Sequence, residues 1–394
     1  MATSTMGDTA ASAQEMIVRA RELAPRFAQR AAGAEEARRL PAESVQEMLD
    51  AGFARILVPR RFGGCELDLA TWFDVMLEIS KADASHGWWA GLLAHHAHII
   101  AQYPLEAQQA VWAAGPDVAI AASFAPTAEI TGVDGGYRVS GQNSAFASGV
   151  DHSTWVMLGG IVTEGETRDW RLFLIPRSDY AIRDTWHMTG MRATGSNTIV
   201  TDSVFVPQAR TIGIAELRQG KAPGGAAHAG PLYRALFFHY APLAFAGPML
   251  GAARGAYEHF RERTKARKAG DGSSMAEKPA IQVRMARAAA DLDAAELLLR
   301  RTTQAPYAPD AHSQELLARS VRDFARASEL VVAAIDALIA SGGTAGFAAA
   351  NPIQRAWRDI HLSAMHISLD VEMNYAHFAR MELGLGRDPF RPFF

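Results

Sequence analysis

Apolar positions along the chain follow two different periods. In the segment AESVQEMLDAGF (42–53), Val45, Met48 and Leu49 recur three to four residues apart or side by side, the spacing of one buried helix face. Similar patterns run through residues 12–115, including two longer helices that we expect within 72–103, broken near ADASHG. The pattern returns in long alanine-rich runs, which predict an antiparallel helical bundle and cover 279–304, 312–340 and 353–384.

Between these helical parts, from 118 to about 212, the helical period gives way to short apolar runs separated by turn residues. Examples are VAIAASF, RLFLIP and NTIVTDSVFVP, and DGG is a typical turn signal. This pattern predicts a β domain of the size of a small barrel or sandwich. We therefore expect an N-terminal helical domain at 1–115, a central β domain at 116–225 and a C-terminal helical bundle at 226–394.

Three glycines at the start of the predicted bundle lie four residues apart, at Gly247, Gly251 and Gly255. A stripe of small residues on one helix face lets another backbone approach closely. We expect a neighbouring helix to pack tightly against this stripe.

The composition is that of an ordinary globular protein, with 394 residues, 21% of them charged, and a net charge of −3. This balance provides no field that would favour nucleic acid or an anionic membrane. Cys65 is the only cysteine, so an intramolecular disulfide is impossible and a reducing compartment suits the chain. The first residues, MATSTMGDTAASAQEM, lack the features of a signal peptide, and the apolar stretches are too short to span a membrane. We expect a cytoplasmic protein without a nucleic-acid or membrane partner.

Several common catalytic and cofactor motifs are absent from the sequence. It contains no GxxxxGK[ST], no HExxH and no GxGxxG, which argues against a Rossmann cofactor domain. It contains no GxSxG, which argues against a hydrolase nucleophile elbow. Ser123 and Ser148 lie in the predicted strands, where a serine taken alone is usually a solvent-facing residue.

Histidines form two groups in different helical regions. His95, His96 and His98 are adjacent, but helical spacing does not direct all three to one metal ion, so we expect no metal site. A hydrogen-bonded position at a helix interface is the default explanation for each of them. The second group, His361 and His366, could still converge with the first on one pocket.

Five segments, in order over nearly the whole chain, carry a resemblance to one family. They are AGFARILVPRRFGG (51–64), GYRVSGQNSAFASG (136–149), GMRATGSNTIVTDSVFVP (190–207), SGGTAGF (341–347) and QRAWRDIH (354–361). Together they resemble the acyl-CoA dehydrogenase superfamily. The resemblance implies an α+β fold with an N-terminal helical domain, a central β-barrel or sandwich and a C-terminal four-helix bundle. That order agrees with the order read from the periodicity.

One departure from the family pattern decides which branch the chain resembles. The dehydrogenases commonly place a catalytic glutamate in a Tyr-Glu-Gly tripeptide after Arg-Asp, and here His366-Ile367-Ser368 stands in its place. The chain thereby resembles the oxygenase components of two-component flavin-dependent monooxygenases. In that branch a late histidine faces the substrate, and His366 matches it.

The resemblance implies roles for further residues. Phe146 would offer an apolar face to the flavin ring and Ser148 a hydrogen bond to flavin N5. The substrate pocket would be lined by His96, Ser123 and Trp88, although core packing alone could explain the tryptophan. His95 is adjacent to His96, and the match leaves open which of the two faces the pocket. The remaining flavin-binding candidates are Arg263, Gly342 and Gly343.

The implied reaction is the hydroxylation of a small aromatic substrate, of indole or phenol type, through a C4a-hydroperoxyflavin. Reduced flavin, FADH2 or FMNH2, would come from a separate NAD(P)H-flavin reductase, and molecular oxygen would be the co-substrate. The family also implies a homotetramer. Two alternatives are an acyl-CoA dehydrogenase or oxidase and a non-catalytic binding protein of the same fold.

Overall fold

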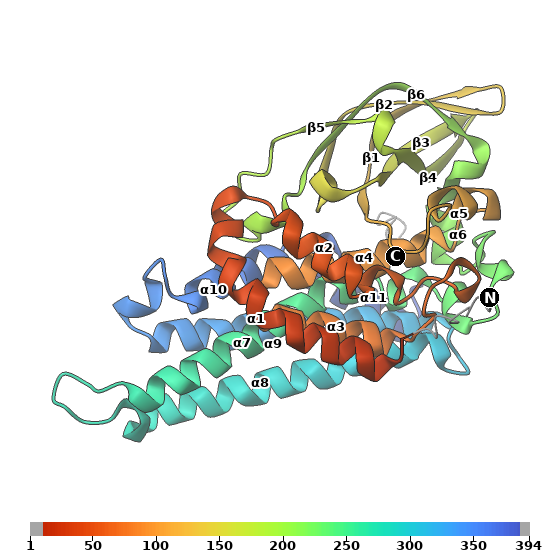
Figure 1. The fold of residues 1–394 in the computed structure, drawn as a ribbon. Helices are drawn as coiled ribbons and strands as arrows, with labels where there is room; N and C mark the ends of the chain where they lie inside the picture. Colours follow the sequence, from red (N-terminus) through yellow and green to blue (C-terminus); the bar gives the residue numbers. More distant parts are fainter. Residues whose placement is uncertain (1–10, 387–394) are drawn as a thin grey trace, which may run out of the picture.

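The elements follow the order that the sequence predicts, helices first, then strands, then helices again (Figure 1). The computed structural model describes residues 11–386. The N-terminal helices are α1 (Ala13–Ala37), α2 (Ala42–Asp50), α3 (Leu69–Ser80), α4 (Ala84–Ile100) and α5 (Leu105–Val111). The strands are β1 (Ile120–Val133), β2 (Gly136–Ala147), β3 (Trp155–Glu164), β4 (Thr167–Pro176), β5 (Ala181–Arg183), β6 (Asn197–Pro207) and β7 (Thr211–Gly213). The later helices are α6 (Ile214–Arg218), α7 (Leu243–Ala266), α8 (Pro279–Gln304), α9 (Gln314–Ser341), α10 (Pro352–Ala364) and α11 (Val371–Glu382).

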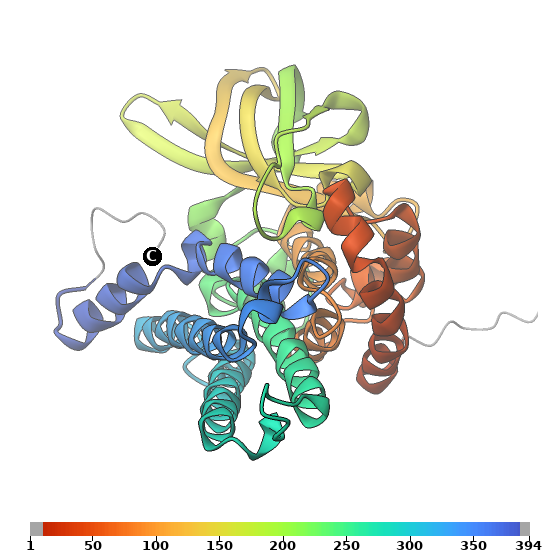
Figure 2. The ribbon, with the colours of Figure 1, turned by 90° about the vertical axis from the view of Figure 1, so that its left-hand side faces the viewer.

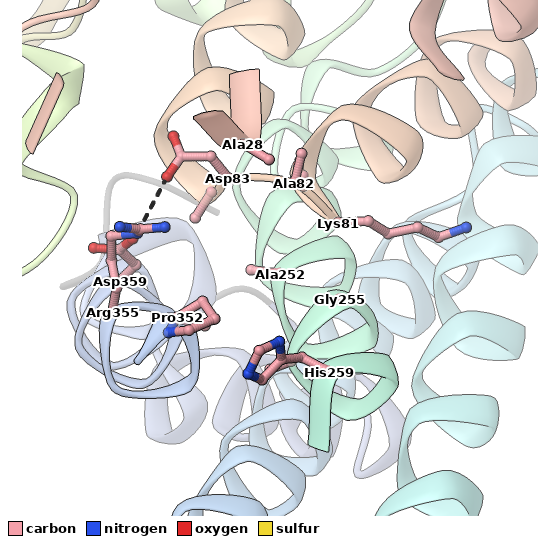
Figure 3. A pocket seen from close by; sticks show the side chains of 14 residues that line it. Ala28, Lys81, Ala82, Asp83, Ala252, Gly255, His259, Pro352, Arg355 and Asp359 are labelled. Atoms are coloured by element: carbon pink, nitrogen blue, oxygen red, sulfur yellow. Dashed lines mark ion pairs between the residues drawn. The ribbon is translucent and has the colours of Figure 1, made fainter. Parts of the chain in front are cut away.

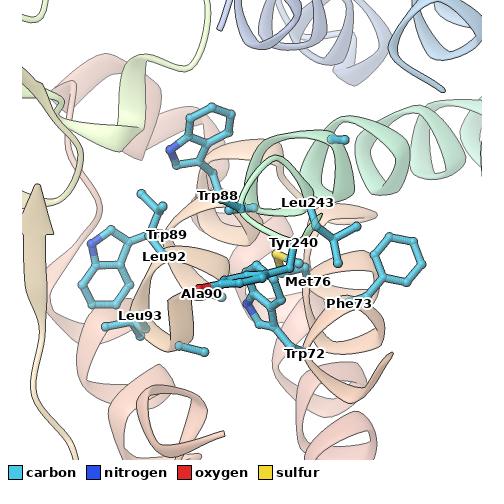
Figure 4. Packing of buried hydrophobic residues seen from close by; sticks show 14 of the residues in the cluster. Trp72, Phe73, Met76, Trp88, Trp89, Ala90, Leu92, Leu93, Tyr240 and Leu243 are labelled. Carbon is cyan, nitrogen blue, oxygen red and sulfur yellow. The ribbon is translucent and has the colours of Figure 1, made fainter. Parts of the chain in front are cut away.

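Helix α4 is the central helix of the N-terminal part, and all of its residues are buried. The predicted break near ADASHG is confirmed, because α3 ends at Ser80 and Asp83 caps the start of α4 by accepting the backbone N–H of His86 at 3.1 Å. Figure 4 shows the apolar packing around this helix. The side chains labelled there come from α3, α4, the start of α7 and the segment just before it, and include Trp72, Met76, Trp88, Tyr240 and Leu243.

The strands form one seven-stranded mixed sheet in the order β5-β6-β2-β1-β3-β4-β7. Strands β1 and β3 run parallel, and all other neighbours in the sheet are antiparallel. Figures 1 and 2 show the sheet curving over one side of the helices. It has a small apolar core of its own, which includes Val139, Val156, Phe173 and Ile199.

The glycine stripe on α7 packs against α3, as predicted. A Cβ at Gly251 would lie 2.7 Å from the carbonyl oxygen of Leu77, and a Cβ at Gly255 would lie 2.0 Å from that of Lys81. Only a residue without a side chain permits this approach. The contact joins the N-terminal helices to the C-terminal bundle and gives the two parts a common core.

The last predicted helical run, 353–384, is not one helix. α10 ends at Ala364, a 3₁₀ turn spans Ile367–Leu369, and α11 begins at Val371. Two side chains stabilise the break: His366 Nδ1 accepts the N–H of Ser368 at 3.3 Å, and Asp370 caps α11 by accepting the N–H of Met373 at 2.7 Å. His366 therefore lies in a turn between two helices rather than on a helix face.

Within residues 11–386, no helix is long and apolar enough to cross a membrane. The segment on which the signal-peptide prediction depends lies largely outside the described residues, which begin at Ala11.

Burial lowers the pKa of several histidines, because a charged imidazole loses its hydration in the interior. The pKa falls from 6.5 to about 4 for His96, His98, His239 and His366. The unfolded chain therefore binds more protons than the folded chain between these values, and stability is lost as the pH falls below 6.5. Asp359 has the opposite effect on stability over the same pH range, because burial raises its pKa to about 7. The four histidines outweigh this single carboxyl group.

We expect the free energy of unfolding to decrease between pH 6.5 and pH 5, by up to about 1.4 kcal/mol per pH unit for each such histidine. Urea unfolding at a series of pH values measures this slope. His98→Gln should make the slope shallower by one histidine's share. His187→Gln, which changes a side chain that is 65% exposed, is the matched control and should leave the slope unchanged. Stability that is constant or increases below pH 6.5 would contradict this account.

Candidate active site

The indole of Trp88 joins the two residues on which the sequence analysis places the chemistry. Its Nε1 donates a hydrogen bond to Ser148 Oγ at 3.2 Å. Its ring lies 6.1 Å, centroid to centroid, from the imidazole of His366, and 5.0 Å from the ring of Phe245. Phe245 stacks directly on His366 at 3.6 Å. Ser148 and His366 therefore both lie next to one indole, that of Trp88.

Ser148 follows a strand end whose backbone is strained. Phe146, two residues earlier, has a φ of 65°, and its side chain is 68% exposed. Phenylalanine rarely adopts this left-handed conformation, and such strain concentrates at functional sites. The exposed ring meets Trp186 edge to face at 6.1 Å. Phe146 thus presents an exposed apolar surface two residues before the hydroxyl of Ser148, and its contact with the flavin stays a prediction.

A row of buried hydroxyl groups continues from Ser148 into the loop before β6. Ser148 Oγ lies 2.8 Å from Ser196 Oγ, and Ser196 Oγ lies 2.7 Å from Thr194 Oγ1. Thr194 Oγ1 donates to the carbonyl oxygen of Met191 at 2.8 Å. Gly149 N–H donates to the carbonyl oxygen of Thr194 at 2.8 Å and fixes the loop against the end of β2.

Helix α10 holds this loop in place. The carboxylate of Asp359 accepts the backbone N–H of Met191 at 2.5 Å, and a Cβ at Gly190 would lie 2.3 Å from the carbonyl oxygen of Arg358. Burial, together with the nearby Asp83 carboxylate, raises the pKa of Asp359 to about 7. The helix that leads to His366 thus also positions the loop behind Ser148.

A cavity of about 230 Å³ lies beside Asp359 (Figure 3). Asp83 and Arg355, which form an ion pair at 3.6 Å, line it from α4 and α10. Asp83 also bonds His86 Nδ1 at 2.6 Å, so its charge is already compensated. Trp88, Ser148 and His366 are not among the lining residues, so this cavity is separate from the candidate site.

His95 and His96, between which the sequence left the choice open, differ in their hydrogen bonds. His96 Nδ1 bonds the carbonyl oxygen of Ile120 at 2.6 Å, which places the hydrogen on Nδ1 and leaves the lone pair of Nε2 free. Both ring nitrogens of His95 are buried without a partner, between Trp72 and Phe237. Each neutral ring therefore keeps one nitrogen lone pair that these bonds do not use, and only in His96 is the position of the ring hydrogen fixed.

Ser123 lies on β1, three residues after the strand's contact with His96. Its Oγ donates to the carbonyl oxygen of Ala145 at 2.8 Å, and its side chain is buried. The hydroxyl oxygen of Ser123 can still accept a hydrogen bond near Ala145, the residue before Phe146 on β2. The structure thus places Ser123 near the strand end that carries Ser148, without a direct contact between the two serines.

The three remaining flavin-binding candidates lie elsewhere in the chain. Arg263 and Gly342 line a depression at the far end of α7, and Gly343 follows with a φ of 58° and only Arg267 within reach of a Cβ. Eighteen residues of helix separate Arg263 from Phe245, which corresponds to roughly 27 Å. One chain therefore does not bring this group to Ser148.

Arg267, which the sequence analysis did not single out, is the arginine that contacts the glycines. Its Nη1 donates to the carbonyl oxygen of Gly342 at 3.2 Å. The sequence offers three arginines in RERTKAR (261–267) as possible partners of the glycines, and it does not show which of them makes the contact. Within the described residues, no group of three or more histidine, cysteine or acidic side chains could hold a metal ion.

Comparisons with known proteins show the family to which the chain belongs. Two family descriptions match: "Acyl-CoA dehydrogenase, N-terminal domain" over residues 11–115 and "Acyl-CoA dehydrogenase, C-terminal domain" over residues 243–371. The chain is 36% identical over 382 residues to the flavin-dependent monooxygenase oxygenase subunit HsaA of Mycobacterium tuberculosis, with 95% of this chain and 96% of HsaA covered. It is 37% identical over 388 residues to the oxygenase component of the FADH2-dependent resorcinol hydroxylase of a Rhizobium species, with 94% of each chain covered.

A solved structure shows the same fold. The crystal structure of the HsaA monooxygenase from M. tuberculosis superposes with a TM-score of 0.90 at 34% identity, and covers 96% of this chain and 99% of that one. These matches define an enzyme of the acyl-CoA dehydrogenase superfamily. Within it, the chain belongs to the family of flavin-dependent monooxygenase oxygenase components.

The close packing of Gly149, the residue after Ser148, against Trp89 can be tested by substitution. A Cβ at Gly149, whose φ is 69°, would lie 1.7 Å from Trp89 Nε1. Gly149→Ala should therefore decrease the free energy of unfolding by about 1–2 kcal/mol for the left-handed backbone and a further 1–3 kcal/mol for the clash. Gly165→Ala, at a φ of 60° with nothing within 4 Å, is the control for the backbone cost alone. Equal losses in the two variants, measured by urea unfolding, would show that the Trp89 contact is unimportant.

Proposed function

We propose that this protein hydroxylates an aromatic substrate of phenol or indole type, using reduced flavin and molecular oxygen. The observation that carries the proposal is the convergence of Ser148 and an uncharged His366 on Trp88. The resorcinol hydroxylase among the relatives supports a phenol as the first substrate class to test. The reduced flavin, FADH2 or FMNH2, would come from a separate NAD(P)H-flavin reductase.

The residues near Ser148 fit the isoalloxazine ring. The exposed ring of Phe146 can cover its apolar part, and the hydroxyl of Ser148 has a lone pair that Trp88 does not use. When bound, the reduced flavin supplies the electrons that activate oxygen. The buried indole of Trp88 and the partly buried phenyl ring of Phe245 would exclude water from the reacting atoms.

Two neutral imidazoles would serve the substrate. Burial lowers the pKa of both His96 and His366 to about 4, so each is an uncharged base at neutral pH. His96 Nε2 can accept a hydrogen bond from a phenol O–H or an indole N–H, and Ser123 lies near the same strand. His366 Nδ1 accepts the N–H of Ser368, so the neutral ring carries its hydrogen on Nε2. His366 has a free lone pair for a substrate proton only when this hydrogen bond opens.

An acyl-CoA dehydrogenase or oxidase would need a carboxylate base in place of the imidazole of His366. The ring that stacks on this imidazole is the apolar phenyl of Phe245, and burial keeps the imidazole uncharged at neutral pH. This environment supports proton transfer by a neutral histidine rather than by a glutamate.

The distance between the two groups of flavin-binding candidates supports a shared site. The depression at Arg263, Arg267 and Gly342 lies at the far end of α7 from Trp88, so a flavin that reaches both would lie between two copies of the chain. We infer a homotetramer on this ground and on the family resemblance. The cytoplasm is the compartment that suits the buried, unpaired Cys65.

The activity is tested by combining the protein with a flavin reductase, NADH, FAD or FMN, and a panel of phenols and indole. We expect a purified protein with little bound oxidised flavin that forms hydroxylated product only when reduced flavin is supplied. Reduction of an electron acceptor by acyl-CoA, with no product from any phenol or indole, would favour a dehydrogenase instead.

The role of His366 is tested separately. His366→Asn should lower the rate of product formation by about 10²–10⁴-fold, because general-base assistance is lost. Oxygen consumption should continue, with hydrogen peroxide as the product. His361→Asn alters the other histidine of the same helix region, which faces Asp336, and should leave the rate unchanged.

His96→Asn completes this set, because it separates binding from proton transfer. If His96 only binds the substrate hydroxyl, the variant should raise KM about tenfold and change kcat little. A large fall in kcat in His96→Asn, together with a normal kcat in His366→Asn, would move the base from His366 to His96.

A further inference from the structure

We propose that the buried hydroxyls of Thr194 and Ser196 fix the direction of the Ser148 hydrogen and thereby make the site selective for reduced over oxidised flavin. Both are positioning residues, since they act through Ser148. The inference rests on the proposed function, because it assumes that Ser148 meets flavin N5. Neither residue was singled out for a role by the sequence motifs.

The two ends of the hydrogen-bonded row have fixed chemistry. At one end, the indole nitrogen of Trp88 can only donate, and it donates to Ser148 Oγ at 3.2 Å. At the other end, the carbonyl oxygen of Met191 can only accept, and it accepts from Thr194 Oγ1 at 2.8 Å. The same carbonyl also accepts Trp186 Nε1 at 2.9 Å, which holds it in place.

These fixed ends determine the hydroxyl hydrogens between them. Thr194 has one hydroxyl hydrogen and gives it to Met191, so in its 2.7 Å contact with Ser196 it must be the acceptor. Ser196 has then used its only hydrogen, so in the 2.8 Å contact with Ser148 it must also be the acceptor. Ser148 therefore donates to Ser196, and its hydrogen points away from any ligand.

What remains on Ser148 is one lone pair, since the other accepts from Trp88. Flavin N5 carries a hydrogen in the reduced state and only a lone pair in the oxidised state. The remaining lone pair of Ser148 can accept the N5–H of reduced flavin. Oxidised flavin would bring two lone pairs together, unless the Ser148–Ser196 bond breaks first.

Burial makes this arrangement persistent. Ser148, Thr194 and Ser196 are all buried, so a hydroxyl that loses its partner finds no water to replace it. Leaving a buried donor unsatisfied costs about 1–3 kcal/mol, whereas the complete row satisfies every hydrogen. Reversing one hydroxyl requires the others to reverse with it, and Met191 cannot become a donor.

The test measures binding of FAD in its two states rather than turnover. Dissociation constants are determined for oxidised FAD in air and for dithionite-reduced FAD under nitrogen. The ratio of the dissociation constant of oxidised FAD to that of reduced FAD is then compared between variants. Wild-type protein should bind reduced FAD more tightly. Ser196→Ala frees the Ser148 hydrogen to turn to oxidised N5, so the ratio should fall about 3- to 10-fold. The midpoint potential of the bound flavin should fall by about 15–30 mV in parallel.

Thr194 provides a second, independent pair of variants. Thr194→Val removes the acceptor for Ser196 while keeping the side-chain shape, and should lower the ratio in the same direction. Thr194→Ser keeps the hydroxyl and should keep the ratio. Thr201→Val is the control outside the row, since Thr201 is a buried threonine of β6 whose hydroxyl has no partner. Circular dichroism establishes that each variant is folded.

The outcomes separate the inference from the function on which it rests. Unchanged ratios in folded Ser196→Ala and Thr194→Val, with FAD still bound, would overturn the role of the row and leave the proposed function intact. A wild-type protein that prefers oxidised FAD would also overturn it. If folded wild-type protein binds neither FAD nor FMN in either state, the proposed function fails as well.

Discussion

The indole of Trp88 is the contact on which the arrangement of the site depends. Its N–H donates to Ser148 from the β domain, and its ring meets Phe245 and His366 from the C-terminal bundle. Three parts of the chain that are distant in sequence thus share one side chain of α4. Because α4 is buried along its whole length, the indole has little freedom to move, and the two groups that touch it are held at a fixed separation.

Other contacts transmit this rigidity to the rest of the molecule. The glycines of α7 let α3 approach backbone to backbone, which fixes the position of Phe245 relative to α4. Asp359 on α10 accepts the N–H of Met191, so the helix that precedes His366 also anchors the loop behind Ser148. Reactivity in such a site depends on small distances, and a fold that couples both groups to one helix keeps these distances constant.

The sequence was sufficient for the order of the elements and for the family, because five short segments have recognisable neighbours, and it proposes Ser148 and His366 from two places along the same resemblance. It did not predict the break between α10 and α11, since no proline or glycine interrupts residues 365–370 and the capping by Asp370 is visible only in three dimensions. It left open which of His95 and His96 faces the pocket, because the partners of their ring nitrogens, such as the carbonyl of Ile120 in the sheet, are not visible in the sequence. Thr194 and Ser196 were within a recognised segment, but their donor directions depend on Trp88 and Met191 together.

The position of His366 in a turn has a consequence for redesign of this enzyme. A residue within a helix must satisfy helix propensity and the packing of its own turn, which restricts what can replace it. At position 366 the backbone is extended, with a φ of −65° and a ψ of 133°, and the flanking side chains Met365 and Ile367 point largely into solvent. The backbone at this position therefore accepts many residue types, and a replacement has to make up for two side-chain contacts, the hydrogen bond from Ser368 N–H and the stacking on Phe245.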